Sequence, residues 1–330
     1  MDDRAALFHA YLDQHDQRAW QDTLARLRPT MHEVDRAATE IWFHFYPLVI
    51  ARALRNSDDR GFIMRKLWLQ GSPDLIEHFN TSHVFLYGHR YWPAVVAAIN
   101  AHMSSERAPA SLDLATVIRD LAARSAAQAR VPDSLTIGIS AVGLMTLQQL
   151  GVDMFLKAAH DARVHISSAI AAKTAEQVLK ARARDRGQGW FGFLKGIKRE
   201  HTVTFDEHDR QATFVAIETQ HITTAAANDR RDYRERDARC HEGPIPVQCR
   251  SASCGTCWIG VLGGQPHLQP MEDRERQRLR EFGYIDTSEP QPLIRLACMS
   301  QVTGPVSIVI PPYNGIFGKY RREQELSHRT

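Results

Sequence analysis

The spacing of the cysteines constrains this 330-residue chain more than any other feature. Cys249, Cys254 and Cys257 lie within the nine residues CRSASCGTC, and Cys298 follows Cys257 by 41 positions. The residues between the three clustered cysteines are Ser, Ala, Gly, Thr and one Arg. Such a loop can fold tightly and direct thiols and backbone N–H groups toward one small anionic group. The fifth cysteine, Cys240, precedes the loop.

This spacing is typical of the plant-type arrangement of ligands for a [2Fe–2S] cluster. Two irons bridged by two sulfides need four thiolates, two for each iron, so a loop with three cysteines needs one remote partner. Small side chains leave room for the cluster, and N–H groups that point at sulfur stabilise its reduced state. A structural zinc ion is the alternative, since it also takes four thiolates, but zinc sites usually combine two close Cys pairs or add histidines.

Two segments resemble the plant-type [2Fe–2S] ferredoxin family. The stretch IPVQCRSASCGTCWIGVLGG is similar to the cluster loop of the family and the strand that follows it. The stretch RLACMSQVTGPVSIVIP, residues 295–311, is similar to the segment with the fourth ligand and to the last strand. The resemblance covers about residues 200–312. It implies a β-grasp fold, one-electron transfer and iron ligation by Cys249, Cys254, Cys257 and Cys298, with Cys240 as a spectator.

The chain also departs from the family. The gap of 41 positions before Cys298 is long, and we expect it to contain a charged helix at Glu272–Gly283 with Leu279 and Phe282 as its apolar contacts. The segment NDRRDYRERDARCHEG is highly charged where the family usually has an amphipathic helix. Residues 201–330 carry 16 Lys and Arg against 17 Asp and Glu, a net charge of −1. This balance does not favour strong acidic steering toward a basic partner.

The remaining pattern of the last 130 residues predicts a small α+β domain. Residues 201–205 and 212–218 are rich in β-branched side chains and indicate a hairpin. Residues 257–268 indicate a strand that ends in a Gly-Gly turn, and residues 304–312 indicate a last strand.

The first 186 residues indicate an all-α bundle of six or seven helices. Leu114, Val117, Ile118 and Leu121 recur at the spacing of one helical face. Another helix is expected around residues 34–45, with Thr30 as its cap and Pro47 at its end. The apolar stretch LTIGISAVGLMTL is too short to span a bilayer, and we interpret it as part of a buried helix from Asp133 through Leu156.

Histidines are frequent in this helical part, but no paired Glu-x-x-His motif of a di-iron bundle is present. A haem would need one axial His in an apolar and aromatic setting, and SHVFLYGHRYWPAVV offers His83 or His89. The simpler interpretation is that the histidines are surface or hydrogen-bonded residues. A haem in the helical domain therefore stays an alternative.

A change of composition near residue 190 predicts a domain boundary. Gly187, Gly189 and Gly192 interrupt the helical pattern, and apolar residues then alternate with Lys and Arg up to Arg199. We predict an all-helical domain at 1–186, a linker at 187–200 and a [2Fe–2S] ferredoxin-type domain at 201–330. An amphipathic contact of residues 190–199 with a membrane surface or a partner is the alternative to a simple linker.

Composition and charge limit the class of protein. The chain has a net charge of +3, so nucleic acid is not expected as a partner. It has no secretory signal at its N-terminus and no predicted transmembrane segment, so the cytoplasm is the expected compartment.

No catalytic residue and no glycine fingerprint for a dinucleotide after a strand are evident. We expect an electron carrier or redox-complex subunit rather than an enzyme, with a redox protein as donor and acceptor. The helical domain would serve docking or oligomerisation, a homo-oligomer included. A multi-centre redox protein and a [2Fe–2S] redox sensor are the alternatives.

Overall fold

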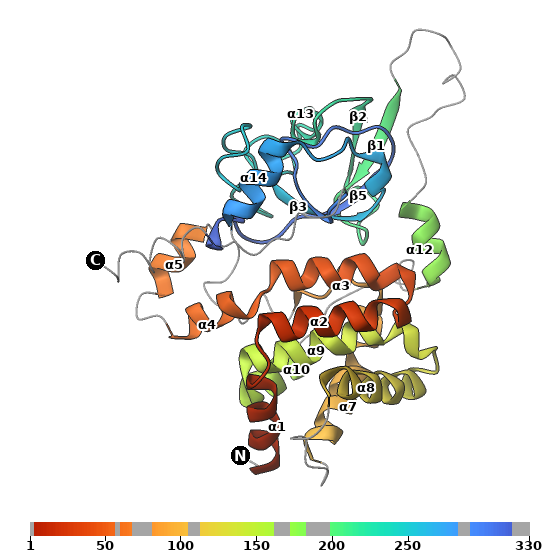
Figure 1. Ribbon diagram of the computed structural model, residues 1–330. Helices are drawn as coiled ribbons and strands as arrows, with labels where there is room; N and C mark the ends of the chain where they lie inside the picture. Colours follow the sequence, from red (N-terminus) through yellow and green to blue (C-terminus); the bar gives the residue numbers. More distant parts are fainter. Residues whose placement is uncertain are drawn as a thin grey trace. The chain divides into compact units, whose positions relative to one another are not determined.

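The computed structural model describes residues 3–56, 60–67, 81–104, 113–161, 172–182, 199–282 and 291–318 (Figure 1). The chain divides into two compact units, each made from two stretches of sequence. The first is Met1–Asp58 with Asp74–Ala175, and the second is Asp59–Pro73 with Glu176–Thr330. The predicted domain limits stay predictions, and most of the predicted linker, residues 187–198, lies outside the described residues.

The first unit is helical throughout its described part, as the periodicity of the sequence predicts. The face formed by Leu114, Val117, Ile118 and Leu121 is buried. The α-helices are α1 (Asp3–Asp13), α2 (Gln17–Leu27), α3 (Glu33–Phe45), α4 (Leu48–Asn56), α7 (Trp92–Met103), α8 (Leu114–Ala129), α9 (Ile137–Leu150) and α10 (Val152–Asp161). Short 3-10 helices lie between them: η1 (Arg28–Thr30), η2 (Tyr87–Tyr91) and η4 (Asp133–Leu135).

Helix α9 is the core of this unit. All of its residues are buried, and it contacts α1, α3, α4, α7, α8 and α10. The side chain of Gln148 accepts a hydrogen bond from Trp20 Nε1 at 2.7 Å, and Gln149 Nε2 donates to the backbone oxygen of Tyr46 at 2.6 Å. Because a buried polar group without a partner costs about 1–3 kcal/mol, these bonds fix α2 and the end of α3 against α9. No helix in the described ranges is both long and apolar enough to cross a bilayer.

Two helix ends differ from the sequence-based prediction. The apolar helix expected from Asp133 through Leu156 is broken, because Gly151 has a φ of 78° and ends α9. This left-handed conformation suits glycine, which has no Cβ. Helix α3 is capped by His32 rather than by Thr30, and it ends before Pro47 as predicted.

The second unit contains a mixed five-stranded sheet (Figure 1). Its strands are β1 (Glu200–Thr204), β2 (Thr213–Ile217), β3 (Trp258–Gly263), β4 (Ile294–Leu296) and β5 (Val306–Val309), in the order β2-β1-β5-β3-β4. Strands β1 and β5 are parallel, and the other neighbours are antiparallel. This sheet is consistent with the ferredoxin-like domain that the resemblance implies.

Four helices accompany the sheet: α5 (Arg60–Leu67), α12 (Ala175–Arg182), α13 (Ile222–Ala226) and α14 (Asp273–Phe282). Helix α13 packs against β2, and α14 packs against β4. Helix α14 confirms the charged helix predicted in the long gap before Cys298, and Leu279 and Phe282 are buried as expected. A 3-10 helix, η5 (Gln265–His267), follows β3.

Candidate metal centre

Two strand ends bring Cys257 and Cys298 close together in space. Cys257 directly precedes β3, and Cys298 follows the end of β4 by two residues. Trp258 of β3 pairs with Leu296 of β4, and the backbone N of Ala297 donates to the oxygen of Cys257 at 2.9 Å. The antiparallel pairing of β3 and β4 therefore places the distant cysteine next to the loop.

The thiols of the four predicted ligands interact as two pairs. The hydrogen bond between the buried side chains of Cys257 and Cys298 raises the pKa of Cys257 and lowers the pKa of Cys298. Cys249 and Cys254 form the second hydrogen-bonded pair. The pairs also act on each other electrostatically, Cys249 on Cys298 and Cys254 on Cys257. All four side chains thus converge on one place in the second unit.

Hydrogen bonds favour the thiolate form of the first cysteine in the loop. Burial alone would raise the pKa of Cys249, but hydrogen bonds from the Ser253 hydroxyl, the Ser251 backbone and Cys254 outweigh it and lower the pKa to about 6. The pKa of Cys254 is raised, chiefly by burial. Since the thiolate is the form that binds a metal, a metal held at this site would displace the remaining thiol protons.

The backbone of the loop forms a cradle for an anion. Arg250, Ala252 and Gly255 have φ values of 51°, 63° and 68°, so left-handed residues recur along the loop. Such alternation turns successive N–H groups toward a common concave side. The backbone N of Ser251 donates to Cys249 Sγ at 3.5 Å, and the backbone of Ala252 hydrogen-bonds Cys298 and favours its thiolate.

Gly255 permits close packing beneath the loop. A Cβ at this position would lie 2.7 Å from Cγ2 of Ile316 and 3.1 Å from Cζ of Phe282. The backbone N of Gly315 donates to the oxygen of Gly255 at 2.9 Å. The loop is therefore held from below by the segment that follows β5 and by the end of α14.

The site has a buried side and a partly exposed side. Cys257 and Cys298 are buried, whereas Cys249 and Cys254 are only partly covered. Between the last two, Ser253 is exposed, and so is Arg250, which pairs with Glu242. A redox group held here would have one edge close to the molecular surface.

Cys240 lies apart from these interactions. Its thiol is buried and donates to the backbone oxygen of Pro244 at 3.3 Å. Burial is the main reason that the pKa of Cys240 rises to about 12, and the other contributions come from Asp237 and two arginines rather than from the four thiols. These surroundings suit the predicted role of a spectator.

The described side chains do not form a compact site for one metal ion. No group of three or more His, Cys, Asp or Glu residues in the described ranges converges closely enough to hold a single ion. The thiols are arranged as two pairs instead. Two thiolates for each iron is the ligand set that a [2Fe–2S] cluster needs.

Helix α14 contributes a buried carboxylate that the sequence interpretation missed. Glu275 is fully buried and forms an ion pair with the buried Arg295, with Nη2 of Arg295 at 2.9 Å from Oε2. The sequence interpretation named only Leu279 and Phe282 as the contacts of this charged helix. The signal was nevertheless present, since Glu275, Leu279 and Phe282 follow the i, i+4, i+7 spacing of one helical face.

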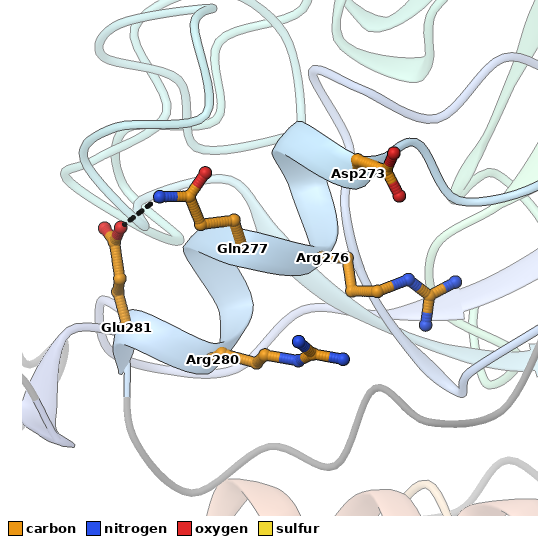
Figure 2. Close-up of a pocket in the computed structure, with 5 residues that line it drawn as sticks. All are labelled: Asp273, Arg276, Gln277, Arg280 and Glu281. Carbon is orange, nitrogen blue, oxygen red and sulfur yellow. Dashed lines mark hydrogen bonds between the residues drawn. The ribbon is translucent and has the colours of Figure 1, made fainter.

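The outer side of α14 forms a shallow charged pocket (Figure 2). Arg276 and Arg280 extend to the same side in this view, and Gln277 donates to Oε1 of Glu281 at 3.2 Å. Asp273 completes the lining. None of the four clustered thiols lines this pocket, which is separate from the candidate metal centre.

The two histidines considered for a haem are buried in the first unit. The ring of His83 lies 3.8 Å from the ring of Trp92 and 4.8 Å from the ring of His89, measured between centroids. A haem in this unit stays a prediction.

Comparison with known proteins identifies part of the second unit. Residues 215–303 match the family model of the 2Fe-2S iron-sulfur cluster binding domain. The matched segment includes all four converging cysteines, and the cofactor of this domain is a [2Fe–2S] cluster. The helical N-terminal part has no family match. No curated protein and no solved structure gives a significant match to the chain.

Proposed function

We propose that this protein is an electron carrier in which Cys249, Cys254, Cys257 and Cys298 hold the [2Fe–2S] cluster of a β-grasp ferredoxin domain. The convergence of these four thiols inside the matched 2Fe-2S domain carries the proposal. When bound, the cluster gains and loses one electron. A reducing compartment such as the cytoplasm keeps the thiols available for iron.

The two pairs of thiols would divide the ligands between the two irons. Cys249 with Cys254, and Cys257 with Cys298, each supply the two thiolates that one iron needs. The backbone N–H groups of Ser251 and Ala252 donate to sulfur. Hydrogen bonds of this kind stabilise the additional negative charge of a reduced cluster.

The partly exposed edge of the loop is the proposed route for electrons. Cys249 and Cys254 lie at this edge, and the exposed Gln248 and Ser253 flank them. A redox protein that docks on this edge comes closest to the cluster. Donor and acceptor would use it in turn.

The helical unit is proposed to serve docking or oligomerisation. Leu7 of α1 is 63% exposed and Leu156 of α10 is 39% exposed, and these two helices contact each other. Exposed leucines on adjacent helices suit a contact with another protein. Two alternatives to a simple carrier remain: a second redox centre in this unit, and a redox sensor. Each predicts a different result in the experiment below.

The test is the metal content and visible spectrum of the purified full-length protein. We expect two irons and two acid-labile sulfides per chain, with visible absorption that bleaches on reduction. Zinc without labile sulfide would refute the proposal. A Soret band would replace the simple carrier by a multi-centre redox protein, and a partner affinity that changes on reduction would favour the sensor.

A further inference from the structure

The buried carboxylate of Glu275 holds the strand that leads to Cys298. Arg295 donates to it twice, from Nε to Oε1 at 3.0 Å and from Nη2 to Oε2 at 2.9 Å. The backbone N of Leu296 donates to Oε1 at 2.6 Å. Glu275 is fully buried and Arg295 is 2% exposed, so water does not replace these bonds.

Leu296 in turn anchors the turn that carries Cys298. Its backbone oxygen accepts hydrogen bonds from the N of Met299 at 2.8 Å and from Oγ of Ser300 at 3.0 Å. The N–H of Leu296 therefore binds the Glu275 carboxylate, and the carbonyl oxygen of the same residue binds the turn that contains Cys298. Displacing Glu275 would therefore displace the fourth proposed ligand.

The negative end of this ion pair lies against the segment that carries Cys298. The Glu275 carboxylate accepts from the N–H of Leu296, two residues before Cys298, and from Arg295, three residues before it. A fixed negative charge near a redox group opposes the arrival of an electron, and a nearby positive charge favours it.

We propose that the buried Glu275–Arg295 pair is a positioning device that sets the reduction potential of the cluster, with Glu275 lowering the potential and Arg295 compensating for it. The inference rests on the proposed function, because it requires a cluster held by Cys298. It assigns a redox role to a helix, α14, that lies outside the loop with the other three cysteines.

The test is a redox titration of the full-length holoprotein and three variants. Glu275→Gln keeps an acceptor for the N–H of Leu296 and leaves the charge of Arg295 uncompensated, so its potential should become more positive. Arg295→Met leaves the carboxylate uncompensated, so its potential should become more negative. The double variant removes both charges and should return toward the wild-type value.

A purely structural role gives a different result. It would weaken cluster retention in both single variants, with no shift in potential or with shifts of the same sign, and this outcome would overturn the inference. A loss of the cluster in Arg295→Met alone does not end the test. The reduction potentials of Glu275→Gln and of the double variant are then compared, and adding Arg295→Met to Glu275→Gln must reverse the positive shift; no reversal would overturn the inference.

The matched control is Asp237→Asn. Asp237 pairs with the buried Arg239 at 2.7 Å, and the other side-chain bonds of Arg239 go to Pro311 and Asn314 rather than to the strand that leads to Cys298. This variant should lower the unfolding midpoint without shifting the potential. A wild-type protein without iron and labile sulfide would refute the proposed function itself, whereas a wild-type cluster with unshifted variants would refute only the role of Glu275.

Discussion

Cys298 and Cys240 show how much the surroundings of a single residue decide its role. Both are buried, and a count of cysteines does not distinguish them. The thiol of Cys298 hydrogen-bonds another cysteine and receives a backbone bond from Ala252, whereas the thiol of Cys240 donates to a carbonyl oxygen. A thiol engaged as a donor, with its pKa raised to about 12, is a poor metal ligand.

This contrast gives a prediction for two single variants. Cys298→Ser should lose most of its iron and labile sulfide, because one iron would be left with a single thiolate. Cys240→Ser should retain the visible spectrum and the iron content of the wild type. Both quantities are measured on purified full-length protein, and an exchange of the two results would show that the ligand assignment is wrong.

Among the elements, the cysteine loop depends most on its backbone conformation. Its left-handed residues direct N–H groups toward sulfur, and its glycine allows Ile316 and Phe282 to approach. The conformation of the loop therefore serves two requirements. It directs N–H groups toward the cysteine sulfurs, and it allows close packing against Gly255.

Gly255→Ala should destabilise the second unit by about 2 kcal/mol, because an L-residue is strained at a φ of 68° and its Cβ would clash with Ile316. The measurements are the free energy of unfolding and the rate of iron loss to a chelator. Gly151→Ala is the control, since φ is 78° there but the nearest atom to an added Cβ is His9 Nε2 at 3.9 Å. The control should lose stability without faster iron loss, and equal iron loss in both variants would contradict the role given to Gly255.

At the scale of the whole molecule, an ion pair between the buried Arg182 and the partly buried Glu207 ties α12 to the sheet. Arg182 of α12 donates to both carboxylate oxygens of Glu207, at 2.7 and 2.9 Å, and Ser307 of β5 donates to Oε1 at 2.6 Å. Burial alone would raise the pKa of Glu207, but Arg182 and Ser307 lower it overall. A group whose pKa is lower in the folded state stabilises the fold above its unfolded pKa and stops doing so as the pH falls through its folded pKa.

Glu207→Gln should therefore cost about 3 kcal/mol of unfolding free energy at neutral pH, because Arg182 is left buried without its counter-charge. The difference from the wild type should begin to shrink below about pH 5, where this carboxylate starts to protonate in the unfolded chain, and should vanish as the pH falls through the lower pKa of the folded state. Chemical unfolding over a pH series measures this difference. Asp232→Asn is the control, since Asp232 has a pKa of about 2 but is exposed, and it should change little. A difference independent of pH would contradict the role of the pair.

The sequence predicted the parts that depend on local pattern and on cysteine spacing. The buried face of α8 follows from its periodicity, and α14 follows from the length of the gap before Cys298. The break at Gly151 was missed because apolar residues on both sides continue the pattern of one helix. The pairing of Glu275 with Arg295 was missed because only Leu279 and Phe282 were named as contacts of the charged helix. The burial of the pair depends on the tertiary packing of α14 on β4.

The second unit is assembled from stretches far apart in the chain, and this sets the order in which its contacts can form during synthesis. The backbone N of Asn314 donates to the oxygen of Leu67 at 2.8 Å, and the next residue, Gly315, bonds to Gly255 of the cysteine loop. A ribosome releases Leu67 long before it makes Asn314, so the early stretch waits for its final neighbour until residue 314 has been made. The support beneath the loop is completed only then, so the proposed cluster would gain its full support only once residue 315 has been made.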